Sequence, residues 1–155
     1  MRLSRTLLAV AALLLVGACS DSPKESNVTK DEALTRVAER AQEAGQHLPP
    51  GAKLVLQQSV PNIPCDNGDD RIFVENSYNV DFPKDWPVDQ SMTTLADYWA
   101  ANGYKIVRDD RAGTQIPELV VEKEADGFRI GYMINHNPDG LVNARILSSS
   151  PCLSS

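Results

Sequence analysis

The 155-residue chain predicts an α+β fold: a two-layer sandwich with two helices packed on one face of an antiparallel sheet of about five or six strands. Apolar residues recur at helical spacing in two segments, 30–45 and 89–102. Between them, segment 72–82 alternates apolar and polar residues, which is the two-residue period of a half-buried strand. Four strand-like segments follow with connections too short for a crossover, so neighbouring strands should be antiparallel.

The first helix should begin after Thr29, because Thr29 and Glu32 stand at the spacing of a capping box. Gly45 offers the left-handed residue that commonly ends a helix. Residues 53–59 form a short strand candidate, and the proline- and glycine-containing segment 60–70 is predicted to be a loop. The predicted core stripe of this helix is Leu34, Val37, Ala38 and Ala41.

The strand at 72–82 has one polar interruption on its apolar face. Asn76 stands among the residues that should point inward. A buried amide needs hydrogen-bond partners, so we expect a paired core residue rather than a ligand contact. The rest of that face is Ile72, Val74, Tyr78, Val80 and Phe82.

The second helix has the clearest boundaries in the chain. Asp89 or Ser91 is the expected N-cap of the segment 89–102, and Gly103 follows its last residue. Its predicted core stripe is Met92, Leu95, Ala96 and Trp99.

The last part of the chain predicts four strands and a hairpin. The turn segment 135–140 contains Pro138 and ends in Asp-Gly, so the strands on either side of it, 128–135 and 141–147, should form that hairpin. Trp99, Tyr104 and Tyr132 are expected in the core. The four strands are predicted at 104–108, 117–123, 128–135 and 141–147.

The first residues have the pattern of an export signal. Arg2 and Arg5 give a basic start, and residues 7–16 form an uninterrupted apolar run. This run is about half the roughly 20 residues that a membrane-spanning helix needs. Small residues then stand directly before Cys19, as in the lipobox of bacterial lipoprotein signals, so we expect Cys19 to be lipidated. The alternative is an ordinary secretory signal in which Cys19 is incidental.

The predicted organisation is a lipoprotein signal peptide (1–18), a lipidated flexible tether (19–28) and a single α+β domain (29–155). Removing the signal takes Arg2 and Arg5 from 15 basic against 21 acidic residues, which leaves 13 against 21, a net charge of −8. That sign argues against nucleic acid as a partner. The expected location is the extracytoplasmic face of the cell membrane.

Lipid on Cys19 leaves one pair of cysteines. Cys65 and Cys152 would meet an oxidising environment after export, which favours a disulfide between them. A metal site is the weaker alternative, because His47 and His136 are far apart and neither has a neighbouring ligand in the sequence. A catalytic thiol would need a nearby base. The sequence therefore predicts a disulfide, no metal and no cofactor.

Three segments carry a resemblance to a known class of proteins. They are a tryptophan-containing helix that runs into a Gly-Tyr strand start (95–105), Asp-Gly-Phe at 126–128 and Ser-Ser-Pro-Cys at 149–152. Over about residues 53–152 the chain resembles small actinobacterial lipoproteins of unknown function. The resemblance implies an α+β fold with one disulfide and contributes no catalytic residues.

Motifs of metal-dependent or nucleophilic enzymes do not emerge from the sequence. Segment 65–70 has the composition of a calcium loop. A hand-type loop starting at Asp66 would, however, need glycine where Arg71 stands and glutamate where Ser77 stands. A Gly-x-Ser-x-Gly elbow and a phosphate-binding glycine loop are both absent from the sequence.

Two carboxylate pairs and one tryptophan remain as candidates. Glu122 with Glu124, and Asp81 with Asp85, are close in sequence, but their positions relative to each other depend on the fold. Trp86 lies between Asp85 and Pro87 at the entry to a helix, so it is the candidate surface contact.

We therefore expect a membrane-anchored, non-catalytic binding or interaction module of the cell envelope. Its partners would be the membrane, through lipid on Cys19, and an envelope protein or small ligand. One alternative is a small envelope hydrolase that uses carboxylates. Another is an inhibitor or accessory subunit of a larger exported protein, which would need an apolar patch of interface size.

Overall fold

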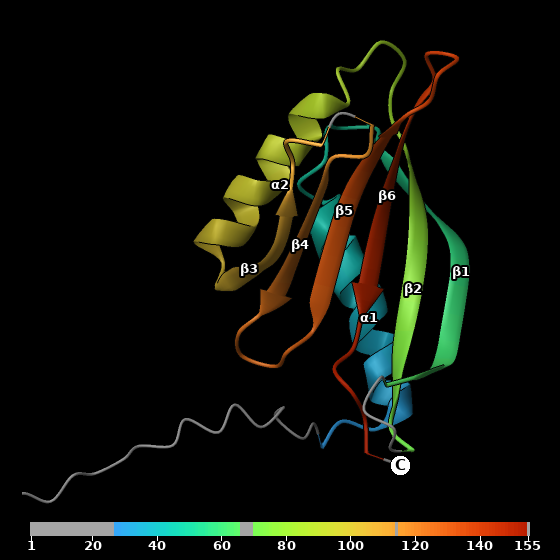
Figure 1. Ribbon diagram of the computed structural model, residues 1–155, viewed down its shortest axis with the longest axis vertical. Coiled ribbons are helices and arrows are strands. Elements are labelled where there is room, and N and C mark those ends of the chain that lie inside the picture. The colour runs from blue at the N-terminus through green and yellow to red at the C-terminus, as the bar shows by residue number, and fades with distance from the viewer. Residues whose placement is uncertain (1–26, 66–69, 114, 155) are drawn as a thin grey trace, which may run out of the picture.

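The computed structural model describes residues 27–65, 70–113 and 115–154, and these form the predicted α+β fold (Figure 1). The predicted signal peptide (1–18), Cys19 and the tether up to residue 26 lie outside the described residues. The helices are α1 (Lys30–Gly45) and α2 (Asp89–Ala101). The strands are β1 (Lys53–Pro64), β2 (Ile72–Asp81), β3 (Tyr104–Asp110), β4 (Glu118–Lys123), β5 (Arg129–His136) and β6 (Val142–Ser149).

The strands form one antiparallel sheet in the order β1-β2-β6-β5-β4-β3. The predicted hairpin is confirmed, because β5 pairs with β6 from Arg129 opposite Ser149 to His136 opposite Val142. Gly140 in its turn has a φ of 84°, a backbone conformation that favours glycine. Because of this strand order, β1 and β3 are the two edges of the sheet.

Both helices pack on the same face of the sheet. α1 lies over β1, β2 and β6, whereas α2 lies over β3, β4 and β5 (Figure 1). Residues of both helices join one core cluster with the predicted apolar faces of the strands. The most deeply buried strand residues of that face are Val74, Leu119, Val121, Ile130, Tyr132, Ile134, Ala144 and Ile146.

α1 begins and ends where predicted, but its last residue does not have the predicted conformation. Glu32 N–H donates to Thr29 Oγ1 at 3.3 Å, and Thr29 N–H donates to Glu32 Oε2 at 3.0 Å, which completes the capping box. Gly45 is the last residue of α1, but it does not adopt the predicted left-handed conformation, and a Cβ atom there would be 2.9 Å from Leu54 Cδ1. The glycine therefore permits close approach of α1 to β1. The buried stripe is Ala33, Val37, Ala41 and Ala44.

β1 is longer than predicted, since the expected loop from residue 60 begins as strand and β1 ends at Pro64. Pro61 and Pro64 can occupy this strand because an edge strand tolerates residues without an N–H donor. The pairing with β2 shifts register after Leu56 and again after Val60. The two prolines therefore predicted a loop, but this strand lies at the edge of the sheet, where its pairing with β2 can continue.

α2 begins without the predicted side-chain cap. Its N-cap is Val88, so neither Asp89 nor Ser91 has that role. The Ser91 hydroxyl instead donates to the Val88 carbonyl and is hydrogen-bonded to the hydroxyl of Tyr132 on β5. Gly103 has a φ of 71°, in agreement with its predicted place after the helix. The buried stripe is Ser91, Met92, Leu95 and Trp99, with Ala96 only partly buried.

The predicted disulfide is present. Cys65 and Cys152 are bonded with an S–S distance of 2.08 Å and a Cα–Cα distance of 6.3 Å. The bond joins the residue after β1 to the segment after β6. Beside it, Leu153 N–H donates to the carbonyl of Ile72 at 2.7 Å. The C-terminal segment is therefore fixed to the start of β2 at this end of the sheet.

Candidate functional site

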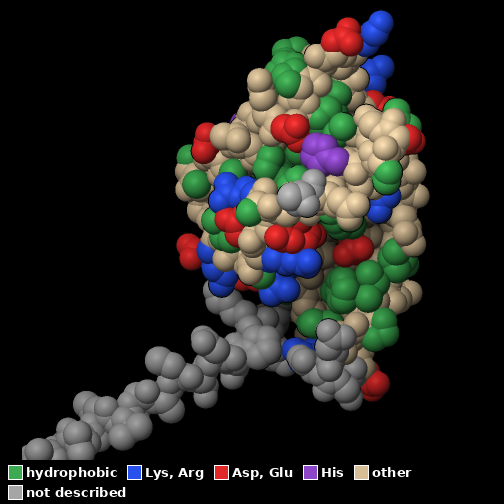
Figure 2. All heavy atoms as spheres, turned by 45° about the horizontal axis from the view of Figure 1, so that its top comes forward, with side chains coloured by type: hydrophobic (Ala, Val, Ile, Leu, Met, Phe, Trp, Pro, Cys, Tyr) green, Lys and Arg blue, Asp and Glu red, His purple; other side chains and the backbone are tan. Residues whose placement is uncertain are grey.

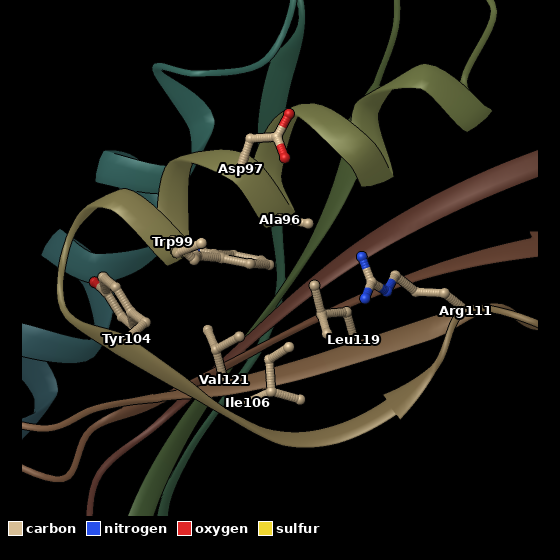
Figure 3. Close-up of a pocket in the computed structure, with 9 residues that line it drawn as sticks. Ala96, Asp97, Trp99, Tyr104, Ile106, Arg111, Leu119 and Val121 are labelled. Atoms are coloured by element: carbon tan, nitrogen blue, oxygen red, sulfur yellow. The ribbon is translucent and has the colours of Figure 1, made fainter.

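A groove of about 460 Å³ lies between α2 and the β3–β4 edge of the sheet. Figure 3 shows the side chains of Trp99, Leu119, Val121 and Ile106 in the space between the helix and the strands, with Arg111 reaching toward the helix. The groove is lined by Ala96, Asp97, Trp99 and Ala100 of α2, Tyr104 and Ile106 of β3, Arg111 after β3, and Leu119 and Val121 of β4.

Small helix residues facing larger strand residues create the groove. Ala96 and Ala100 present only methyl groups, so they leave space above Leu119 and Val121, which are almost fully buried. Ile106 lines the same space and remains 57% exposed, because β3 is the last strand of the sheet. The apolar floor of the groove therefore continues to the molecular surface at the sheet edge.

The rim of the groove carries charges of both signs. Arg111 Nε donates to Asp109 Oδ1 at 2.8 Å. This hydrogen bond holds the pKa of Asp109 at about 2 and raises the pKa of Arg111, which the nearby carboxylate of Asp97 raises further. An apolar floor with a few polar groups at its edge is the usual composition of a ligand site.

A polar network joins α1 to α2 beside the groove. The Arg40 guanidinium lies 2.9 Å from Asp126 Oδ2 and 3.0 Å from Glu43 Oε2. The hydroxyl of Tyr98 donates to Glu43. Burial and this hydrogen bond raise the pKa of Tyr98, so its hydroxyl keeps its proton and remains a donor at neutral pH. The network ties α2 to α1 and to the turn after β4.

The sheet face without helices carries paired charges near the β3 edge. Glu122 accepts from Arg129 at 2.9 Å and lies 3.1 Å from Lys105 Nζ, while Arg108 pairs with Glu118 at 3.1 Å. Burial alone would raise the pKa of Glu122, but the hydrogen bonds from Arg129 and Lys105 outweigh it and lower the pKa. Figure 2 shows acidic and basic side chains interleaved on the visible side of the molecule.

Trp86, the predicted surface contact, is partly buried. Its backbone N–H donates to the Pro83 carbonyl at 3.2 Å, and its indole Nε1 is buried without a hydrogen-bond partner among the described residues. It precedes α2, whereas the groove lies along the second half of that helix. Asn76 points inward as expected, and its amide donates to the Tyr78 hydroxyl at 3.2 Å, but its Oδ1 has no partner in the described part of the chain.

The two histidines lie apart, each with its own partner. His47 stacks on Tyr98 with 3.6 Å between ring centroids. His136 Nε2 lies 3.2 Å from Asp89 Oδ1, between β5 and the start of α2. Within residues 27–65, 70–113 and 115–154, three or more His, Cys, Asp or Glu side chains do not gather at any point where they could hold a metal ion. Residues 66–69 of the calcium-loop candidate lie outside the described residues.

The carboxylates weighed for catalysis have structural surroundings. Glu122 is ion-paired, as described above, and Glu124 is exposed after the end of β4. Asp81 ends β2 and Asp85 lies in the following loop with a φ of 64°; both are exposed. Burial raises the pKa of Glu75 on β2, the direction expected of a proton-donating carboxyl, but among the described residues no second carboxylate is paired with it.

Comparison with protein-family models, curated proteins and solved structures gave no match for this chain. Among the described residues, neither helix has the length and apolar composition needed to cross a membrane. The groove is therefore interpreted from its own geometry and chemistry.

The sequence did not indicate the groove. Its residues come from three separate predicted elements, and Ile106 and Leu119 look in sequence like ordinary core positions of two strands. Arg111 stood in a segment with the composition of a charged turn. The one available signal was the size of Ala96 and Ala100, one helical turn apart, which predicts a shallow helix surface but not what lies opposite.

Proposed function

We propose that this protein is a membrane-anchored, extracytoplasmic lipoprotein whose domain is a non-catalytic binding module of the cell envelope. The groove between α2 and β3 holds the apolar part of its ligand. The observation that carries the proposal is the cavity of about 460 Å³ with an apolar floor that reaches the surface at Ile106. Ligand sites in proteins commonly have about 300–1,000 Å³ and a mostly apolar lining.

The anchoring part of the proposal rests on the N-terminal sequence. The basic start, the apolar run and the small residues before Cys19 are the features of a lipoprotein signal. A tether of residues 19–28 would span at most about 36 Å when extended. The groove would then be held within a few nanometres of the membrane surface.

The binding part can be tested with the neutral fluorescent probe N-phenyl-1-naphthylamine. Wild-type protein should bind the probe saturably, and Ala100→Phe, which fills the groove, should weaken binding by about tenfold or more, since it removes roughly 1.4 kcal/mol of apolar contact. Thr93→Phe places the same ring on an exposed position of α2 outside the groove and should bind like wild type. Equal binding by all three proteins would contradict the proposal.

The anchoring part can be tested by the intact mass of protein expressed with its full leader. Wild-type protein should be recovered with the membranes, with diacylglycerol on Cys19 and without residues 1–18. Cys19→Ser should move to the soluble fraction and lose the lipid mass. An unmodified Cys19 in the mature protein would contradict a lipid anchor.

A further inference from the structure

β3 presents unpaired backbone groups at the edge of the sheet. Lys123 N–H donates to the carbonyl of Phe128, so the backbone of Lys123 faces β5. Alternate residues of a strand face opposite sides, so Glu122 faces β3 and bonds to its partner Lys105. The N–H and C=O of the next residue, Ile106, therefore point away from β4. Within the described sheet, no strand lies beyond them.

The other edge of the sheet is less able to accept a further strand. β1 contains Pro61 and Pro64 and shifts its register twice, features with which natural proteins limit pairing at edges. β3 contains no proline and has one register shift, between Ile106 and Arg108. Pairing with a further chain is therefore favoured at β3 over β1.

The free edge and the groove lie at the same place. Ile106 both exposes its backbone groups and lines the groove, together with Trp99 and Ala100 of α2. An extended segment paired with β3 would place every second side chain on the helix-covered face. An apolar side chain at the position beside Ile106 would enter the groove, so backbone pairing and the groove can be used by one ligand.

The opposite face of β3 exposes two basic side chains, with the exposed Asp110 at the end of the strand. The side chains of Lys105 and Arg108 are 55% and 65% exposed, whereas their partners Glu122 and Glu118 are only 16% and 13% exposed. Side chains of neighbouring strands on one face lie close enough to interact, and opposite charges attract there. A segment beside β3 is therefore favoured when its residues on this face are acidic.

We infer that the groove binds an extended peptide segment that adds to the free edge of β3. An apolar side chain of the segment occupies the groove, and alternate acidic side chains lie beside Lys105 and Arg108. Recognition by strand addition takes affinity from main-chain hydrogen bonds and specificity from alternate side chains. This inference rests on the proposed function, because it assigns a ligand class to the same groove.

A blocked synthetic peptide, Thr-Glu-Val-Glu-Val-Glu-Val-Thr, tests the inference by calorimetric titration of the mature protein. It should bind saturably, and Ile106→Lys should weaken binding about tenfold or more, while Leu56→Lys should not. Leu56 is the matched control, since it is 54% exposed on the other edge strand and Ile106 is 57% exposed. The same peptide with lysine in place of glutamate should bind more weakly than the parent.

Two methylated peptides separate strand addition from simple apolar binding. In an extended peptide the amides of the three valines face one edge and those of the three glutamates face the other. Methylation of one set should weaken binding about tenfold or more, because it removes the hydrogen bonds to β3, and methylation of the other set should not. Amide exchange at Ile106 should slow when the parent peptide is bound.

Failure of the inference can be distinguished from failure of the proposed function. If the naphthylamine probe binds the groove but the peptide does not, or binds equally with either set of amides methylated, strand addition is wrong and the groove remains a ligand site. If neither the probe nor the peptide binds, the proposed function is wrong as well. A stable dimer in sedimentation that Ile106→Lys dissociates would assign the edge to a second copy of this chain and overturn the peptide proposal.

Discussion

The two ends of the sheet differ in how closely a helix covers its edge strand. At the β1 edge, α1 approaches so closely that a Cβ atom on Gly45 would collide with Leu54 near the start of β1, and the disulfide fixes the opposite end of that strand. At the β3 end, Ala96 and Ala100 of α2 leave a groove of about 460 Å³. One end is closed by packing and a covalent bond, and the other is open to solvent.

The difference shows that small helix residues do not by themselves bring a helix close to a sheet. Ala41 and Ala44 of α1 are fully buried against the strands. Ala96 and Ala100 of α2 are the same residue type, but they line an open groove beside the large, buried Trp99. Stability is therefore expected to depend mainly on the closed end, and binding on the open end.

Among the changes that test this difference, removing the disulfide should have the largest effect on the unfolding free energy. Cys65→Ser with Cys152→Ser removes a bond between residues 87 apart in sequence. In the chain-entropy model this costs about 4–5 kcal/mol of unfolding free energy, an upper figure because strain and residual structure reduce it. Urea denaturation of the oxidised wild type and the double variant gives the difference. The folded double variant should still bind the naphthylamine probe. If it loses both binding and stability, the two edges of the sheet are not independent.

Adding a side chain at each end should have unequal effects. Gly45→Val introduces atoms where α1 and β1 already touch, so it should lower the unfolding free energy by about 1–3 kcal/mol. Ala100→Val adds atoms to the open groove and should change stability by less than about 0.5 kcal/mol. Thermal melts of the two variants give the comparison. An equal loss in both would mean that the groove is closed in solution.

The pH dependence of stability should identify the ion pairs that hold the open end. The pKa of Glu122 is lowered from its ordinary value of 4.5, so the ionised carboxylate stabilises the fold above that value. This stability is lost as the pH falls through the lower pKa of the folded state. Unfolding free energies from urea denaturation should therefore decrease with falling pH below about 5, and less so in Glu122→Gln.

Glu75 provides the opposite sign as a control. Burial raises its pKa, so its ionised form opposes folding at neutral pH and the penalty disappears as the pH falls through the raised value. Glu75→Gln should therefore stabilise the protein at neutral pH and not at acid pH. The interpretation of both carboxylates is wrong if the two variants change the pH profile in the same direction.

Local signals in the sequence predicted most of the fold. The capping box at Thr29, the alternation from Ile72 to Val80 and the Asp-Gly turn before β6 each depend on neighbours within a few residues. The cysteine pair was predicted from the expected export signal and from the even count left when Cys19 is assigned to lipid. Errors occurred where the wider fold decides, as at Pro61, which is tolerated only because β1 is an edge, and at Gly45, which ends α1 in contact with β1 and without the expected left-handed conformation.

The candidate site could not be predicted from local sequence signals, for the same reason. Which strand becomes an edge depends on the order of all six strands. The groove depends on how α2 packs over β3 and β4. Trp86 is aromatic and lies between Asp85 and Pro87 at a helix entry, which predicts a surface contact, but its side chain is half-buried before α2. Ile106, an unremarked position of a predicted strand, is the residue at which the free edge and the groove meet.

The central claim, that the open end binds and the closed end does not, is tested most directly by one matched pair of variants. Ile106 and Leu56 are 57% and 54% exposed on the two edge strands, so a lysine at either position should be tolerated by the fold. Titration with N-phenyl-1-naphthylamine should show at least about a tenfold loss of affinity in Ile106→Lys and wild-type affinity in Leu56→Lys. Equal affinities in the two variants, or a greater loss in Leu56→Lys, would contradict the account.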